Sequence, residues 1–235
     1  MSNIFIQEKE KILSLHNKFN NIKTVYFDYD GTLHDSIKIY VPAFRKAYDY
    51  LVELKKAPVY EYSDEEIAKW LGYTNHEMWN LFMKDLDKSI RKQADNIVKN
   101  EIKNQMYQGN AKLFDNIIDI LKHLKNKGCK LVFLSNCGVE YMEGAKIFFK
   151  LDDYFDDMVC SGMYDYKPKH EILNLIKDNY PMDQVMVGDR FHDIHSAVYN
   201  NIESIFCEYG YGDKEEGKDA SASVKKPLEI LRYIG

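Results

Sequence analysis

The sequence predicts an α/β fold, a Rossmann-like doubly wound parallel sheet that carries an inserted all-helical segment. Short apolar runs of strand character alternate with amphipathic helical patterns, which is typical of a parallel sheet covered on both faces. The alternation is interrupted after the first apolar run, where a long stretch shows helical spacing only. A chain of 235 residues is long enough for one sizeable core with a smaller inserted domain.

Three parts follow from this pattern. Residues 1–22 carry apolar positions at helical spacing and form a predicted N-terminal helical extension. Residues 23–35 and 111–235 form the predicted α/β core, and residues 36–110 form the predicted helical cap.

The individual elements can be placed in chain order. The first strand is expected at residues 23–28, where β-branched and aromatic residues gather. In the cap, Ser63 and Glu66 have the spacing of a capping box that starts a helix. After the cap, a helix ends at Gly128. The remaining strands are expected at KLVFLS, weakly around MVCS, at QVMVGD and at IESIFCEY, with helices between them, and residues 210–223 are the most loop-like stretch.

Composition and charge exclude several classes of protein. Lys and Arg number 32 against 37 for Asp and Glu, a net charge of −5, which argues against a nucleic-acid-binding protein. No run of eighteen apolar residues exists, so no membrane-spanning helix is expected. The four cysteines form no C-x-x-C pair, which argues against a zinc or redox motif and is typical of free thiols in a reducing cytoplasm.

Polar side chains stand where three predicted strands end. Ligands of open α/β sheets bind beyond the carboxyl ends of the strands, so these side chains should meet. They are Asp28 with Asp30, Ser135 with Asn136, and Asp189 with Asp193, joined by Lys167 from a loop just before a helix.

Four crowded carboxylates repel one another unless a cation lies between them. Mg²⁺ prefers oxygen ligands and often binds carboxylates together with substrate phosphate oxygens. Hydroxyl, ammonium and backbone N–H groups are suited to the oxygens of a phosphoryl group. The pattern therefore predicts a phosphate site with a magnesium ion.

The paired aspartates suggest a reaction. Asp28 is ionised at neutral pH and can attack phosphorus to form an aspartyl-phosphate. Asp30 can protonate the leaving alkoxide and later deprotonate the attacking water. Lys167 and Mg²⁺ would neutralise the developing charge.

Each residue also has a simpler interpretation. Asp28 and Asp30 could be turn residues after a strand, and Asp193 could face a helix dipole. Ser135 could be a plain N-cap, and a lone Lys167 would ordinarily be a solvated surface lysine. Only the combination on the expected elements favours a site.

The chain resembles the haloacid dehalogenase superfamily, and in particular its phosphoglycolate phosphatase-like subgroup with a helical cap of the C1 type. DYDGTLHDS resembles the first motif of that family, and Ser135 in LVFLSN the second. Lys167 in YKPKHE resembles the third motif, in which Lys169 stands in place of the usual second proline, and GDRFHD resembles the fourth. The resemblance covers roughly residues 23–212.

The resemblance implies roles for individual residues. By similarity, Asp28 is the nucleophile and Asp30 the acid and base. The implied Mg²⁺ ligands are Asp28, Asp30 through its carbonyl, Asp189 and Asp193. The implied phosphate-binding residues are Thr32, Ser135, Asn136 and Lys167, and the expected substrate-selecting residues are His34, Gly72 and Tyr73.

The expected function is therefore Mg²⁺-dependent hydrolysis of a small phosphorylated metabolite by a cytoplasmic monomer or homodimer that binds neither nucleic acid nor membrane. A phosphosugar mutase resembling β-phosphoglucomutase is the alternative enzyme, and Gly188-Asp189 in the fourth motif argues against it. A non-catalytic, phospho-ligand-binding regulatory protein is the alternative from another class. It has no need of an acid such as Asp30.

Overall fold

The computed structural model describes residues 19–234. The predicted helical extension therefore lies outside the described residues, apart from its last four positions. Among these, Phe19 and Ile22 are buried in the main core, and the Phe19 ring lies 5.2 Å from that of Tyr233 near the C-terminus.

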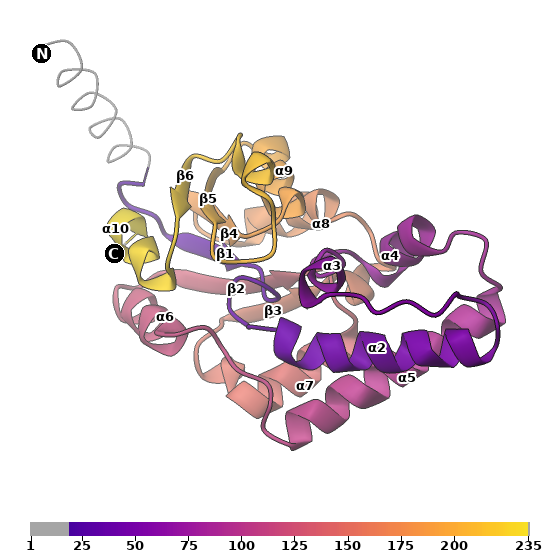
Figure 1. Cartoon of the computed structure of the whole chain (residues 1–235). Helices are drawn as coiled ribbons and strands as arrows, with labels where there is room; N and C mark the ends of the chain where they lie inside the picture. Colours follow the sequence, from indigo (N-terminus) through magenta and orange to yellow (C-terminus); the bar gives the residue numbers. More distant parts are fainter. Residues whose placement is uncertain (1–18, 235) are drawn as a thin grey trace, which may run out of the picture.

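A six-stranded, wholly parallel sheet organises the core, in the order β3-β2-β1-β4-β5-β6 (Figure 1). Its strands are β1 (Thr24–Phe27), β2 (Lys130–Ser135), β3 (Asp157–Cys160), β4 (Gln184–Gly188), β5 (Glu203–Cys207) and β6 (Ala222–Val224). The strand order reverses between β1 and β4, which is the doubly wound topology, so the predicted α/β fold is confirmed.

The α-helices follow the alternation of the sequence. They are α2 (Ile37–Glu53), α3 (Asp64–Ala68), α4 (Asn75–Phe82), α5 (Lys88–Tyr107), α6 (Ile117–Asn126), α7 (Val139–Phe149), α8 (Lys169–Ile176), α9 (Phe191–Asn200) and α10 (Leu231–Ile234). Short 3₁₀ turns lie at Leu151–Asp153, Ser161–Tyr164, Lys177–Asn179, Lys214–Gly217 and Pro227–Ile230.

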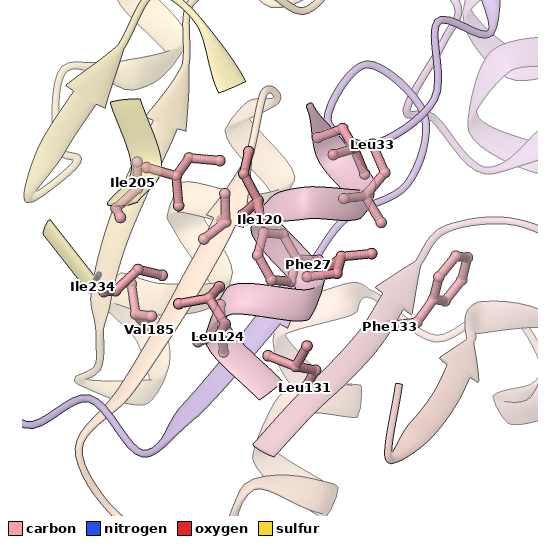
Figure 2. Close-up of a cluster of buried hydrophobic side chains, with 14 of the residues drawn as sticks. Phe27, Leu33, Ile120, Leu124, Leu131, Phe133, Val185, Ile205 and Ile234 are labelled. Atoms are coloured by element: carbon pink, nitrogen blue, oxygen red, sulfur yellow. The ribbon is translucent and has the colours of Figure 1, made fainter. Parts of the chain in front are cut away.

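Both faces of the sheet are buried. Figure 2 shows Phe27 of β1 and Leu131 of β2 beside Ile120 and Leu124 of α6, all members of one cluster. Tyr26, the neighbour of Phe27 in β1, belongs instead to the cluster formed with α8 and α9. Successive strand residues point to opposite faces, and because helices cover both, the middle of β1, β2 and β4 is a continuous apolar run rather than an alternating one.

The helices α2 to α5, here called the helical insertion (residues 37–107), have apolar clusters of their own. Leu51 of α2 packs in one cluster with Trp79 of α4 and Ala94 of α5, and α2 and α5 run side by side (Figure 1). The capping box at Ser63 is present, and Ser63 N–H donates to Glu66 over 2.8 Å. This separate core favours a division of the chain into an α/β core and a helical cap.

One strand was not expected from the sequence. β6 lies at the end of the stretch predicted to be loop-like and pairs in parallel with β5, with Ala222 opposite Ile205. Three residues are too few to show a strand periodicity. Among the helices of residues 19–234, none is long and apolar enough to cross a membrane.

Candidate active site

The ends of β1, β2 and β4 meet at one edge of the sheet. The register places Phe27 beside both Phe133 of β2 and Val187 of β4. Asp28 continues this pairing, since its N–H donates to Val187 O over 2.9 Å. Parallel pairing in this register thus brings Asp28 next to the residues that follow β4.

Three buried carboxylates gather there. Asp28, Asp189 and Asp193 each offer an oxygen, and these oxygens lie within 4.8 Å of one another. Asp28 is 3% exposed, and the other two are fully buried. The ammonium of Lys169 lies among them, 2.8 Å from Oδ1 of Asp28 and 2.6 Å from Oδ1 of Asp193.

Burial dominates the electrostatics of this cluster. It raises the pKa of Asp28 to about 7, against the lowering effect of the Lys169 charge. Burial, followed by the charges of Asp28 and Asp193, raises the pKa of Asp189 well above its usual range. Burial alone would lower the pKa of Lys169, but the two neighbouring carboxylates outweigh it and raise the pKa. One ammonium does not balance three carboxylates.

The cluster fits a divalent cation with a preference for oxygen ligands. Asp189 is held by two donors, since Thr32 Oγ1 donates to its Oδ1 over 3.2 Å and Tyr211 N–H to its Oδ2 over 2.7 Å. Gly31 has a φ of +83°, and a Cβ at this position would lie 2.2 Å from Asp189 Oδ2. The backbone can therefore approach the carboxylates only because residue 31 has no side chain. Carboxylates and a close backbone carbonyl are suitable donors for Mg²⁺.

The lysine that lies among these carboxylates is Lys169, whereas the sequence predicted Lys167. Lys167 is exposed, whereas Lys169 is 4% exposed and is the first residue of α8. The preceding turn explains the difference, because Asp165 and Tyr166 have left-handed backbones with φ of 52° and 56°. With this turn and Pro168 before α8, the second lysine of YKPKHE points to the carboxylates.

Asp30 stands beside the carboxylate cluster and has its own partners. Tyr141 of α7 donates its hydroxyl to Asp30 Oδ1 over 2.8 Å, and His34 Nδ1 lies 3.5 Å from the same oxygen. His34 is fully buried and stacks on Tyr29, with ring centroids 4.8 Å apart. His34 does not line the cavity described below, and its expected role in substrate selection stays a prediction.

Of the expected phosphate-binding residues, some line the cavity beside Asp30 and others lie elsewhere. Ser135 and Asn136, at the end of β2, are both nearly buried and line the cavity next to Asp30. Asn136 Nδ2 donates to Gly72 O over 2.9 Å, while its buried Oδ1 has no hydrogen-bond partner among the described residues. Thr32 lies elsewhere, with its hydroxyl turned to Asp189.

A turn of the helical insertion reaches this site. Gly72 and Tyr73, predicted to select the substrate, both line the cavity described below. Arg190, between two residues of the carboxylate cluster, donates to Leu71 O, and its guanidinium lies 4.9 Å from the Tyr73 ring centre. Gly72 has a φ of +85°, and a Cβ there would lie 2.6 Å from Arg190 Cγ. Arg190 thus joins the insertion to the core.

The sequence analysis did not predict two residues with contacts at this site, Tyr141 and Arg190. Tyr141 is one of eighteen tyrosines and lies over a hundred residues from Asp30. Arg190 fills a position of the fourth motif at which the family pattern specifies no residue type. Their roles depend on contacts across the fold, which periodicity does not report.

Comparison with known proteins places the chain in a family. Residues 25–207 match the model of the haloacid dehalogenase-like hydrolases. A phosphoglycolate phosphatase of Aliivibrio fischeri is 26% identical over 220 residues, which cover 88% of this chain and 92% of the relative. A protein described as a putative pyrophosphatase PpaX, from Clostridium perfringens, is 26% identical over 219 residues, covering 91% of this chain and 97% of the relative.

A solved structure agrees with this assignment. The crystal structure of a predicted phosphatase from Clostridium acetobutylicum superposes with a TM-score of 0.77 at 26% identity, covering 91% of this chain and 98% of that one. The family model spans most of the chain, from the first strand to the fifth. The resemblance seen in the motifs is confirmed, and the chain belongs to the haloacid dehalogenase-like hydrolases.

Proposed function

We propose that the chain is a Mg²⁺-dependent phosphatase that hydrolyses a small phosphomonoester through an aspartyl-phosphate on Asp28. The observation that carries the proposal is the buried cluster of Asp28, Asp189 and Asp193 around the Lys169 ammonium, with Asp30 beside it. Phosphatases among its relatives support the same reaction class.

The first step forms a bond between a carboxylate oxygen of Asp28 and phosphorus while the bond from phosphorus to the ester oxygen breaks. Asp30 donates its proton to the leaving alkoxide. Lys169, already within hydrogen-bond distance of Asp28, neutralises negative charge on the nucleophile and on the phosphoryl group. Ser135 and Asn136 lie where they can bind the phosphoryl oxygens.

The second step returns Asp28 to its free state. Asp30, now ionised, takes a proton from a water molecule that attacks phosphorus, and phosphate leaves. Asp28, the Asp30 carbonyl, Asp189 and Asp193 would hold Mg²⁺, which supplies positive charge for the phosphoryl oxygens and for the crowded carboxylates. The helical insertion would act as a cap that excludes water during the first step. A cytoplasmic monomer or homodimer is part of the same proposal.

The test is release of inorganic phosphate from p-nitrophenyl phosphate with Mg²⁺, compared with the same enzyme in EDTA. We expect turnover that depends on the metal and is lost in Asp28→Asn. Incubation with a hexose 1-phosphate separates hydrolysis from a mutase, since a mutase would give an isomeric sugar phosphate in place of free phosphate. If no phosphate is released from a broad panel of phosphomonoesters, the chain is a phospho-ligand-binding protein instead.

A further inference from the structure

A cavity of about 1190 Å³ lies between the helical insertion and the core. It begins at Asp30, Ser135 and Asn136, where the phosphoryl group would bind, and extends along α5 and α7. Cavities that bury a drug-sized ligand have volumes of roughly 300–1,000 Å³. This cavity therefore has room for a leaving group much larger than a two-carbon acid.

The wall of the cavity is mostly aromatic and aliphatic. The lining aromatic residues of the insertion include Tyr40, Phe44, Trp70, Tyr73 and Trp79. At its rim, Tyr107 of α5 and Ile147 of α7 are 78% and 77% exposed. Exposed apolar surface that continues into a cavity favours a ligand with an apolar ring, because binding removes that surface from water.

One carboxylate stands out on this wall. Oδ1 of Asp95, on α5, accepts hydrogen bonds from Trp79 Nε1 over 2.6 Å and from Asn75 Nδ2 over 2.7 Å. These two donors fix the carboxylate, and within residues 19–234 its Oδ2 receives no hydrogen bond. Asp95 is thus a positioned acceptor with one oxygen left for an O–H or N–H group of a ligand.

The charges near the reacting end disfavour a small anionic leaving group. Asp30 and Asp95 both line the cavity, and the Tyr40 hydroxyl lies close enough that both charges, after burial, raise its pKa. Lys99 and Lys103 also line the cavity but are exposed to solvent, where their charges are screened. A leaving group with its own carboxylate would meet the like charge of Asp95, and Asp30, which carries a proton in the first step, supplies no positive charge to offset it.

We propose that the cavity selects phosphomonoesters whose leaving group is a bulky, ring-bearing alcohol with an O–H or N–H donor for Asp95. The inference rests on the proposed phosphatase function and names its substrate class. It differs from what the relatives' names would suggest, namely phosphoglycolate or pyrophosphate, both of which are small anions.

The first experiment compares kcat/KM of the full chain with Mg²⁺ for five compounds. Adenosine 5′-monophosphate and pyridoxine 5′-phosphate represent the ring-bearing class, 2-phosphoglycolate and pyrophosphate the small anions, and p-nitrophenyl phosphate is the reference. We expect kcat/KM for at least one ring-bearing donor substrate to exceed both small anions by about tenfold or more. Equal or faster turnover of a small anion overturns the inference and leaves the phosphatase function intact. No phosphate from any compound, the reference included, refutes the proposed function itself.

The second experiment replaces Asp95 by Asn, which keeps its size and an acceptor oxygen but removes the charge. We expect kcat/KM for the preferred ring-bearing substrate to fall by about tenfold, mainly through KM, with p-nitrophenyl phosphate changed less than about twofold. Asp49→Asn is the matched control, because Asp49 is an exposed aspartate of α2 that does not line the cavity. An Asp95→Asn enzyme with the same order and ratios of kcat/KM as the original would show that Asp95 does not select the substrate.

Discussion

The ammonium of Lys169 lies 2.8 Å from Oδ1 of Asp28, and both side chains are almost fully buried. Lys169 replaces a proline of the family's usual third motif, whereas Lys167, which matches the motif, is exposed. The structure thus favours Lys169, and the motif Lys167, as the lysine that neutralises charge at the phosphoryl group.

Alanine substitution of each lysine distinguishes the two. We expect Lys169→Ala to lower kcat by about 10²–10³-fold, the usual cost of losing one donor to a developing charge. Lys167→Ala should change kcat less than about threefold. Circular dichroism of both variants with Mg²⁺ serves as the folding control, because Lys169→Ala also leaves buried carboxylates without a partner. A large loss in Lys167→Ala with none in Lys169→Ala would contradict the structure.

Tyr141 offers a test of Asp30 as the acid. Its hydroxyl donates to Asp30 Oδ1 over 2.8 Å and so orients that carboxyl group. Tyr141→Phe should lower kcat by about tenfold for an alkyl phosphate, whose alkoxide needs a proton, and much less for p-nitrophenyl phosphate. Tyr199→Phe, on the exposed part of α9, is the control. An equal loss for both substrates would mean that Tyr141 acts on the fold rather than on proton transfer.

Any side chain at position 31 should clash with Asp189, and comparison with Gly109 separates this clash from the strain of a left-handed backbone. Gly31 and Gly109 have similar left-handed backbones, with φ of +83° and +77°, but only at Gly31 would a Cβ collide, with Asp189. Gly109→Ala should therefore cost only about 1–2 kcal/mol of unfolding free energy. Gly31→Ala should in addition weaken Mg²⁺ binding, measured by calorimetry, and remove activity. Unchanged Mg²⁺ affinity in Gly31→Ala would argue against the assigned cation site.

Glu77 connects the insertion to the core and should contribute stability that depends on pH. His192, whose Nε2 lies 3.6 Å from Glu77 Oε1, and the hydrogen bonds from Thr74 lower the pKa of Glu77 from 4.5 to about 2. A carboxyl group with a lowered pKa in the folded state stabilises the protein above its unfolded pKa and loses this effect as pH falls. The difference in melting temperature between the original chain and Glu77→Gln should shrink as pH falls from about 5 toward 2. If the difference in melting temperature stayed constant over that range, the ionised Glu77 carboxylate would not be the source of the stability.

The strand ends were predictable because each is a short apolar run followed at once by a polar residue. Asp28, Ser135 and Asp189 stand at these points, and parallel pairing then brings them together. No comparable rule predicts which of two lysines in YKPKHE turns inward. That choice depends on the left-handed backbones of Asp165 and Tyr166, which cannot be predicted from these residue types.

The residues that line the cavity were even harder to predict from the sequence. Asp95 lies in the helical run of the cap among many charged residues, and its partner Trp79 is sixteen positions away. Its place in a cavity depends on how α4 and α5 pack. His34 belongs to a recognised motif, but that motif does not predict that its ring stacks on Tyr29.

The most direct test of the account is to look for phosphorus on Asp28. The enzyme is mixed with Mg²⁺ and a turned-over phosphomonoester, quenched in acid within the first turnover, and digested for peptide mass spectrometry. The account predicts a phosphoryl group on the peptide that contains Asp28 in the original chain and none in Asp28→Asn, which should also be inactive. Full turnover by Asp28→Asn, or an unmodified Asp28 during steady turnover with phosphoryl found elsewhere, would contradict it.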